Sequence, residues 1–406
     1  MLLVQAIHSI CHVADGEGRT NGLRKGGIVT YKIALIPGDG VGPEVVGEGV
    51  GVLEAAGELY GINFDWVRYP NGARHYLKTG EIVSEEQLRE MKGMDAIYFG
   101  AVGDPKVKTG ILEKGLLLKM RSYFDQYVNL RPTRAFPGSP CPLAGRAPDE
   151  IQFYVVRENT EDFYVGLGSR FKGTKNRASM KLERALYEMS LDVGIEMKKE
   201  GEIAYQIGLV SRKGAERIIK YAFELAKKKG LEKVTSVDKA NVLSDIYGLW
   251  REVLGEVASG YAKSGISAES QFVDNAAMQF VRNPGQYQVI VAPNMFGDIL
   301  TDLGSALQGS IGCAPSGNIN PEGVSMFEPI HGSAPDIAGR GIANPIGAIL
   351  AGAMMMDELG EAEASSAIES AVRRVLYKGK IKTADLGGKA GTPEMGAAII
   401  RELNSQ

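Results

Sequence analysis

Two aspartates four residues apart, Asp298 and Asp302, have the spacing that points most directly to chemistry. They follow a short apolar run and lie in a segment that can be helical. Residues four apart share one face of a helix, so the two carboxylates would be neighbours. Neighbouring carboxylates repel each other unless a cation lies between them, and oxygen ligands suit a hard ion such as Mg²⁺ or Mn²⁺. The alternative interpretation is an ordinary helix face exposed to solvent. The nearby glycines Gly304, Gly309 and Gly312 argue against this alternative.

The composition is that of a globular protein without a basic surface for nucleic acid. The chain has 406 residues, 44% of them apolar, and a net charge of −3. This length allows two domains, and the charge argues against nucleic acid as a partner. The longest apolar stretch, residues 343–356, is too short to cross a bilayer, so no membrane association is expected. Cys11, Cys141 and Cys313 match no zinc or disulfide spacing, which favours a cytoplasmic protein.

The first 29 residues differ in character from the rest of the chain. Residues 15–27 are polar and rich in glycine, and no basic stretch precedes the apolar start, which argues against a secretory signal. The acidic residues Asp15 and Glu17 argue against a mitochondrial leader. We therefore expect residues 1–29 to be a leader or a misassigned translation start and to lie outside the fold.

Strands and helices alternate along the remaining chain, which predicts an α/β fold. A glycine-rich turn, residues 38–42, follows the first strand, but its third glycine comes one position early for a Rossmann fingerprint. A tight turn and a phosphate contact both remain open for it. The expected strands are 31–36, 64–69, 95–100, 151–157, 203–210, 233–238, 270–273 and 287–292, and the expected helices include 45–60, 181–200 and 212–229.

Five segments together resemble the decarboxylating β-hydroxyacid dehydrogenases, the isocitrate/isopropylmalate dehydrogenase family. They occur in the family order: GDGVGPE at 38–44, RENTE at 157–161, VDKAN at 237–241, NMFGDILTD at 294–302 and HGSAPDIAG at 331–339. The resemblance implies a two-domain isopropylmalate-dehydrogenase-like α/β fold rather than a Rossmann fold. A large domain, 30–126 plus 309–406, would hold the NAD site, and a small domain, 127–308, would hold a dimer interface.

The resemblance also implies which residues act on the substrate. Lys239 is similar to the family's base for the C2 hydroxyl, with Asp238 as its orienting partner, and Tyr164 is similar to the acid that protonates the enolate. Asp298 and Asp302 match two metal ligands for Mg²⁺ or Mn²⁺. Asp274 matches the third, which in this family comes from the other subunit, although it could also simply end a strand. The implied assembly is a homodimer or tetramer with shared active sites.

Three arginines match the family's clamp for the substrate carboxylates: Arg121, Arg131 and Arg157. Because guanidinium groups bind carboxylates through two parallel hydrogen bonds, such a clamp would fix orientation as well as supply charge. Arg121 and Arg131 are ten residues apart, so one element could aim both inward. Leu117 and Leu118 precede Arg121 by four and three residues and could cover the same helix face.

The cofactor implied by the resemblance is NAD. Asp336 and Ile337 stand where NADP-dependent members of the resembled family have Lys-Tyr. A carboxylate accepts hydrogen bonds from ribose hydroxyls but repels a 2′-phosphate. The expected cofactor contacts are Gly40, Gly103, His331, Gly332, Ser333, Ala334, Asp336, Ile337 and Asn344.

The choice of substrate depends on the two leucines. In the isocitrate enzymes that the chain resembles, a Ser and an Asn stand at these positions, so isocitrate and homoisocitrate are disfavoured as substrates. Leucines suit the isopropyl group of 3-isopropylmalate, which is our first expectation and would place the protein in leucine biosynthesis. The segments 124–129 and 140–145 look more like tartrate/D-malate dehydrogenases, so those substrates are the alternative.

Overall fold

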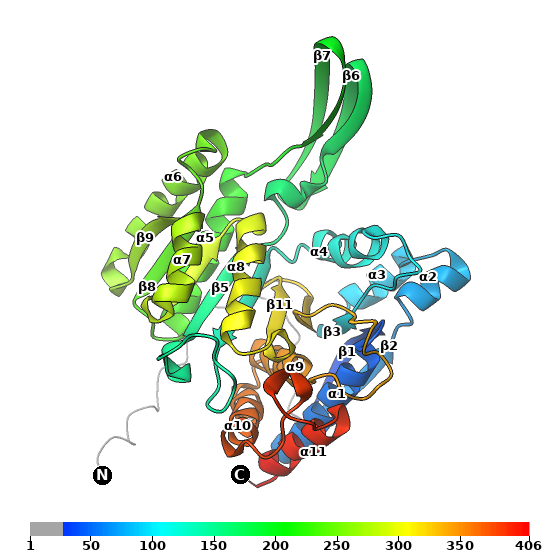
Figure 1. Ribbon diagram of the computed structural model, residues 1–406, viewed down its shortest axis with the longest axis vertical. Coiled ribbons are helices and arrows are strands. Elements are labelled where there is room, and N and C mark those ends of the chain that lie inside the picture. The colour runs from blue at the N-terminus through cyan, green and yellow to red at the C-terminus, as the bar shows by residue number, and fades with distance from the viewer. Residues whose placement is uncertain (1–26, 406) are drawn as a thin grey trace.

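The computed structural model describes residues 27–405, and its elements follow one another along the chain as Figure 1 shows. The strands are β1 (Val29–Gly38), β2 (Ile62–Arg68), β3 (Ala96–Ala101), β4 (Val128–Arg134), β5 (Gln152–Glu158), β6 (Gly168–Arg184), β7 (Tyr187–Gln206), β8 (Lys233–Asp238), β9 (Ser267–Phe272), β10 (Val289–Ala292), β11 (Pro315–Ile319) and β12 (Ser325–Pro329). The α-helices are α1 (Gly42–Tyr60), α2 (Ala73–Thr79), α3 (Glu85–Lys92), α4 (Lys119–Tyr123), α5 (Arg212–Lys228), α6 (Ser244–Tyr261), α7 (Val273–Arg282), α8 (Asn294–Leu307), α9 (Ile346–Glu358), α10 (Ala362–Lys378) and α11 (Thr392–Leu403).

Ten of the strands form one sheet in the order β2-β1-β3-β12-β11-β4-β5-β10-β8-β9. Its two ends are parallel: β2, β1, β3 and β12 on one side, and β5, β10, β8 and β9 on the other. Between them β11 and β4 pair antiparallel with their neighbours and with each other. This confirms the predicted α/β fold with a large, mostly parallel sheet.

Helices cover both faces of the sheet because the buried strands are apolar on both sides. In β1, Ile33 and Leu35 face a cluster that includes side chains of α1, α9, α10 and α11. Ala34 and Ile36 face a second cluster with α3 and α4. Side chains alternate between the faces of a strand, so a continuous apolar run such as this one needs cover on both sides.

Most predicted strands are confirmed, and the start of the fold needs one correction. Val29 begins β1, pairs with Ile62 and is only 5% exposed, so it belongs to the core rather than to a segment outside the fold. The other residues of the predicted leader lie almost entirely outside the described residues. The division at 126/127 and 308/309 into a large and a small domain remains a prediction.

The predicted helix at 181–200 is wrong, because these residues belong to a long ribbon formed by β6 and β7. The ribbon projects from the body of the molecule (Figure 1). In β7 every second residue from Tyr187 to Met197 is apolar and half-buried, while the residues between them are exposed. A period of two is the strand signal, and it decides the structure here over the helix-forming Met, Leu, Glu and Lys residues.

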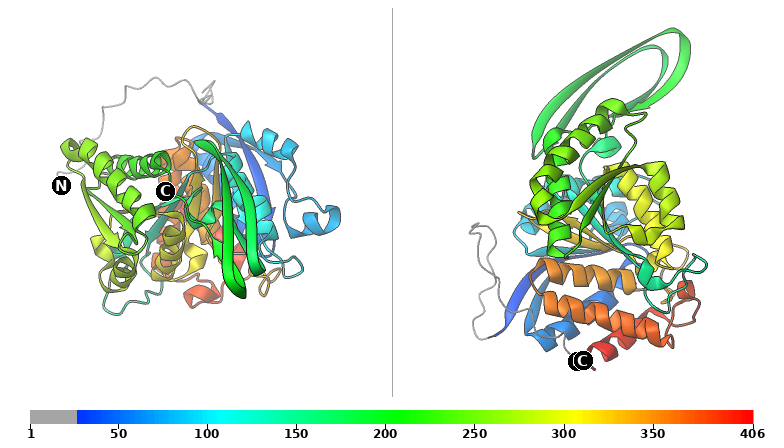
Figure 2. Two further views of the ribbon diagram at one scale, coloured as in Figure 1. Left: turned by 90° about the horizontal axis from the view of Figure 1, so that it is seen from above. Right: turned by 90° about the vertical axis from the view of Figure 1, so that its left-hand side faces the viewer.

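Both ends of the ribbon lie against the body, so the ribbon bends along its length (Figure 2). Its open end is held by the amide of Ile207, which donates to the carbonyl of Leu167 at 2.8 Å. At the closed end the Arg184 guanidinium donates to the carbonyl of Thr160 at 3.0 Å. The pairing register shifts between Gly173 and Lys175, where a bend can form.

Across residues 27–405 the helices are all too short or too polar to cross a membrane.

Candidate active site

Neighbouring strands β5 and β10 bring several predicted site residues together at their carboxyl ends. Ala292 at the end of β10 pairs with Arg157 at the end of β5. Helix α8 begins two residues later, at Asn294, and carries Asp298 in its second turn. Binding residues of α/β proteins gather at this edge of the sheet, and the prediction that Asp298 stands on a helix is confirmed.

Asp298 is the centre of this group. Its Oδ1 accepts a hydrogen bond from Arg157 Nη1, and its Oδ2 accepts one from the hydroxyl of Tyr164 at 2.7 Å. Arg157 is 1% exposed, and its Nε donates to Asn294 at 2.9 Å. Burial alone would raise the pKa of Asp298, but the charges of Arg157 and Arg131 outweigh it and lower that pKa.

Tyr164 lies in a 3₁₀ turn, Asp162–Val165, that points its hydroxyl at Asp298. The Arg157 guanidinium lies 5.3 Å from the centre of its ring. Burial, together with the hydrogen bond to the Asp298 carboxylate and its charge, raises the pKa of Tyr164 to about 12. The phenol therefore keeps its proton at neutral pH.

Arg131 joins the group from the central strand β4. Its Nη1 lies 3.5 Å from Asp298 and 3.9 Å from Asp302, and it donates to the hydroxyl of Thr301 at 2.5 Å. Burial, followed by the charge of Arg157, lowers the pKa of Arg131 to about 10. Burial also raises the pKa of Asp302, and the charge of Asp298 adds to this effect.

Arg121 completes the predicted clamp, although not from the element that carries Arg131. It stands on α4, whereas Arg131 stands on β4, so the expectation that one element aims both is wrong. Arg121 is 5% exposed and pairs with Glu328 of β12 at 3.2 Å. Within residues 27–405, the Nε atoms of Arg121 and Arg131 are buried without a hydrogen-bond partner. Three buried cations thus face Asp298, Glu328 and the more exposed Asp302, and the two unpaired Nε–H groups fit an anionic ligand.

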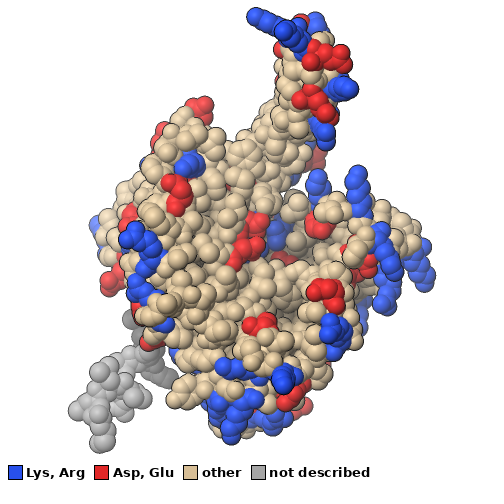
Figure 3. Space-filling view, viewed as in Figure 1, with Lys and Arg blue, Asp and Glu red and all other residues tan. Residues whose placement is uncertain are grey.

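The surface is hollowed between α8 and α4, and acidic and basic side chains meet in this hollow (Figure 3). Sequence reasoning missed four polar residues of the group: Asn294, Thr301, Asp162 and Glu328. Asp162 accepts hydrogen bonds from the Met295 amide and from the Tyr247 hydroxyl, which ties α8 to the turn of Tyr164. The available signal was their position within or beside the family motifs.

Lys239 and Asp274 form a separate ion pair. Over residues 27–405 no hydrogen bond or ion pair joins this pair to Tyr164 or to the arginines. Asp274 does not end a strand but lies in the first turn of α7. The carboxylate of Asp238 accepts from Arg251 Nε at 2.7 Å and from the Ala240 amide at 2.8 Å. Its role as the orienting partner of Lys239 stays a prediction.

The predicted metal site is therefore only partly assembled in one chain. Asp298 and Asp302 lie one helical turn apart beside Arg131, and their oxygens suit a hard cation. Among the described residues, no three acidic, histidine or cysteine side chains come together as metal ligands. One chain brings together two of the three predicted ligands, Asp298 and Asp302. The third, Asp274, would have to come from a second copy of the chain.

The predicted cofactor loop, residues 331–344, lies against the turn between β1 and α1. The Val41 amide donates to the carbonyl of Ser333 at 2.8 Å. Gly40 has a φ of +60°, and a Cβ there would lie 1.9 Å from the Ser333 carbonyl oxygen, so only glycine fits. The Nε2 atom of His331 is buried without a partner, which suits a polar ligand group at the loop.

Other predicted cofactor residues differ in how free they are. Asp336 is exposed. The side chain of Asn344 is already engaged: Nδ2 donates to Asp385 at 2.9 Å, and Oδ1 accepts from the Ile346 amide at 3.0 Å. Gly103, with a φ of +128°, donates its amide to Asp39 at 3.0 Å. Of these side chains, Asp336 therefore has the most freedom to meet a ligand.

The two leucines lie in a wide helical turn. Residues Glu113–Leu118 form a π-helical turn directly before α4, a feature that is frequent at functional sites. Leu117 packs partly against the core beneath it. Leu118 is half-buried and belongs to none of the apolar clusters of the described chain. Leu118 is therefore the more available of the two for a substrate.

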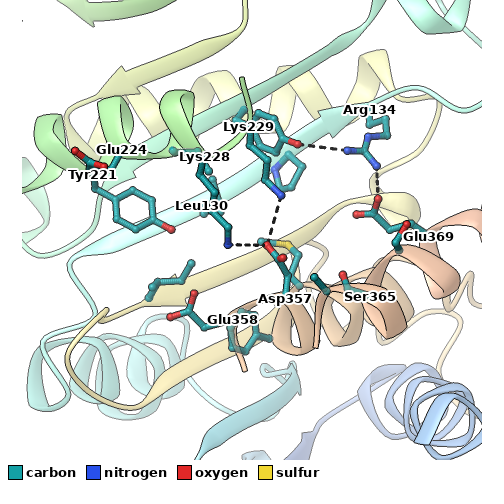
Figure 4. A pocket seen from close by; sticks show the side chains of 18 residues that line it. Leu130, Arg134, Tyr221, Glu224, Lys228, Lys229, Asp357, Glu358, Ser365 and Glu369 are labelled. Atoms are coloured by element: carbon teal, nitrogen blue, oxygen red, sulfur yellow. Dashed lines mark hydrogen bonds and ion pairs between the residues drawn. The ribbon is translucent and has the colours of Figure 1, made fainter. Parts of the chain in front are cut away.

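A second cavity, of about 520 Å³, lies on the other face of β4. Arg134 lines this cavity, whereas Arg131, three residues earlier, joins the active-site group on the opposite face. Ion pairs connect its walls: Arg134 with Glu369 at 2.5 Å, and Lys228 with Asp357 at 3.3 Å (Figure 4). None of the predicted site residues lines this cavity.

Comparisons with known proteins agree with the motifs. The family model described as isocitrate/isopropylmalate dehydrogenase matches residues 32–399. The chain is 43% identical to 3-isopropylmalate dehydrogenase of Thermobifida fusca (strain YX) over 380 residues, covering 93% of this chain and 99% of the relative. It is also 43% identical to D-malate dehydrogenase [decarboxylating] of Escherichia coli (strain K12) over 383 residues, covering 92% and 98%.

A solved structure extends the likeness to three dimensions. The crystal structure of isocitrate dehydrogenase from Methylococcus capsulatus matches with a TM-score of 0.77 and 35% identity, covering 92% of this chain and 99% of that chain. The motifs, the fold and the two full-length relatives thus agree, and the chain belongs to the isocitrate/isopropylmalate dehydrogenase family of decarboxylating dehydrogenases.

Proposed function

We propose that the protein oxidises a 2-hydroxy diacid with NAD and releases CO₂ from the product, and that 3-isopropylmalate is its preferred substrate. The observation that carries this proposal is the group of three buried arginines beside Tyr164 and two aspartates; within residues 27–405, Arg121 and Arg131 each keep a buried Nε–H without a partner. Arg121, Arg131 and Arg157 bind and orient the substrate carboxylates. Because the pocket is buried, these charge-assisted contacts are worth more than they would be in water.

Two residues transfer protons, one at the first step of the reaction and the other at the last step. Lys239 accepts the proton of the C2 hydroxyl, and a bound NAD would take up the hydride from C2. After decarboxylation, Tyr164 donates its proton to the enolate carbon. The position of the Tyr164 hydroxyl supports this role, because it lies 2.7 Å from Asp298 beside the arginines that bind the substrate.

Asp298 and Asp302 hold a divalent ion, Mg²⁺ or Mn²⁺, with Asp274 of a second subunit as the third ligand. A bound ion would polarise the C2 oxygen and stabilise the negative charge of the enolate. The separation of the Lys239–Asp274 pair from the arginine group supports a site shared between two copies of the chain.

The β6–β7 ribbon supports the same assembly, a homodimer or a tetramer built from it. One face carries a row of half-buried apolar side chains, including Met180, Leu191 and Ile203. Near the body Met180 packs against the cluster of Val165, Leu167 and Leu182, whereas Leu191 and Ile203 belong to no apolar cluster of the described residues. A two-stranded ribbon with such an open stretch on its apolar face is marginally stable in water. The ribbon of a second copy presents the same face and would cover it. We place this interface in the small domain, residues 127–308, of a cytoplasmic enzyme.

NAD is the proposed cofactor, bound by the loop 331–344 of the large domain. The exposed carboxylate of Asp336 can accept hydrogen bonds from the ribose hydroxyls and would repel the 2′-phosphate of NADP. Replacing Asp336→Lys together with Ile337→Tyr should move the preference toward NADP. Equal use of both cofactors by the unmodified protein would contradict this part of the proposal.

D-malate or tartrate is the second candidate substrate. The observation in its favour is that the D-malate and 3-isopropylmalate relatives have the same identity to this chain, 43%. Leu118, three residues before Arg121 and outside the apolar clusters of the described residues, favours the larger, apolar substituent of 3-isopropylmalate.

Initial rates of NADH formation test the function directly. The purified protein is assayed with Mg²⁺ and NAD against 3-isopropylmalate, D-malate, tartrate, isocitrate and homoisocitrate. The highest kcat/KM is expected with 3-isopropylmalate, and chelation of the metal with EDTA should abolish it. A higher kcat/KM with D-malate or tartrate than with 3-isopropylmalate would make that acid the preferred substrate. If none of the five acids yields NADH, the proposed function is refuted.

A further inference from the structure

The cofactor loop rests on the first turn of α1 through a carboxylate outside the predicted contact set. Glu44 is the third residue of α1. Its Oε1 accepts a hydrogen bond from the amide of Gly339, and its Oε2 accepts one from the amide of Gly341 at 2.9 Å. A glutamate at this helix position commonly turns back to its own helix end. Here both oxygens reach a segment almost 300 residues later in the chain.

The backbone of this loop needs such support. Gly339 and Gly341 have φ angles of +74° and +61°, and Ala334, which is not a glycine, has a φ of +40°. Residues other than glycine rarely adopt positive φ, so the conformation persists only where surrounding contacts hold it. Glu44 binds the amides of Gly339 and Gly341, whose φ angles glycine adopts freely, whereas the strained Ala334 is held by apolar contacts.

Apolar contacts complete the attachment. Val41 and Val45 of α1 form a small cluster with Ala343, against which Ala334 and Ile337 pack. The loop is thus fastened to α1 by apolar contacts on both sides of Asp336 and by two hydrogen bonds after it. Asp336 itself remains exposed between the two attachments.

We propose that Glu44 is a positioning residue that holds the loop 331–341 in the conformation that receives the cofactor. The proposal rests on the proposed NAD site, because Glu44 acts through the loop rather than on the dinucleotide. A loop that is already ordered loses less conformational entropy on binding, so Glu44 strengthens NAD binding without taking part in the chemistry.

Steady-state kinetics separate this role from a catalytic one. Glu44→Ala removes both acceptors and should raise the KM for NAD about tenfold, the factor that corresponds to about 1.4 kcal/mol. The kcat and the KM for the diacid should stay within about twofold of the unmodified values. Glu44→Gln keeps one oxygen acceptor but turns its side-chain amide NH2 toward a backbone N–H. Its KM for NAD should therefore fall between those of the unmodified protein and Glu44→Ala. Glu54→Gln, an exposed glutamate of the same helix, is the matched control and should change nothing.

Hydrogen exchange of residues 331–341 in the absence of NAD gives a readout that does not depend on activity. Both Glu44 variants should exchange faster in this loop only, and saturating NAD should restore protection. Unchanged exchange in Glu44→Ala would overturn the proposal. Faster exchange with an unchanged KM for NAD would overturn it too, because the loop would then not receive the cofactor. If the unmodified protein forms no NADH with any diacid, the proposed function fails, while exchange with and without NAD still tests Glu44.

Discussion

At the scale of single residues, the arginine group gathers three buried cations, and two of its carboxylates, Asp298 and Asp302, are more exposed than the arginines. Removing one of the three, as in Arg131→Met, should cost about 2–5 kcal/mol of substrate binding, or roughly 30- to 4,000-fold in kcat/KM. The ligand-free protein should nevertheless keep its melting temperature, because the substitution removes one of three mutually repelling buried cations. Kinetics and thermal unfolding without substrate measure the two effects.

Arg251 provides the contrast for this prediction. It pairs with the fully buried Asp238, so Arg251→Met leaves a buried carboxylate without its cation and should lower the melting temperature. A loss of stability in Arg131→Met as large as in Arg251→Met would show that the clamp is balanced in the free protein.

The two leucines should separate specificity from stability. Leu118→Ala removes roughly three carbons from the substrate pocket, worth about 2 kcal/mol at about 0.8 per carbon. Its kcat/KM for 3-isopropylmalate should fall about thirtyfold, with little change for D-malate. Leu117→Ala should also lower the melting temperature, because Leu117 packs against the core. Parallel losses on both substrates in Leu118→Ala would remove Leu118 from the substrate site.

At the scale of elements, the ribbon makes a prediction about assembly. Leu191 lies on the apolar face, opposite Met180, whereas Glu188 lies on the exposed face, opposite Glu183. Leu191→Lys would place a charge in the proposed interface and should dissociate the oligomer, as sedimentation velocity would show. Glu188→Lys changes charge in the same strand and should leave assembly intact. An unmodified protein that sediments as a monomer would contradict the ribbon's proposed role.

Short-range patterns predicted most elements but not the contacts between them. The apolar runs of β5 and β10 and the motifs that follow them are visible in the sequence, so the place of Arg157 and Asp298 could be predicted. The ion pair of Arg121 with Glu328 joins residues 207 apart. It depends on the order of the strands in the sheet, which no local pattern encodes. The π-helical turn before Arg121 likewise has no characteristic amino-acid pattern that would predict it.

At the scale of the whole molecule, a shared site should allow two inactive chains to repair each other. Lys239→Ala and Tyr164→Phe each remove one proton-handling group and should be inactive alone. In a mixed dimer one site receives both substitutions and the other receives neither. After complete subunit exchange, about a quarter of all sites should be intact, and NADH formation should recover accordingly. No recovery, with mixed dimers shown by mass spectrometry, would place Lys239 and Tyr164 in the same subunit's site.

The central position of β11 and β12 has a consequence for how the chain is made. These strands, residues 315–329, separate β3 from β4, so the ribosome delivers the middle of the sheet long after its two flanks. Until then β3 and β4 present open edges, which invite pairing with other nascent chains, and such long-range closure is slow. A chain that stops at residue 308 should therefore collect in the insoluble fraction, and the full-length protein should depend on chaperones most while its last quarter is being translated.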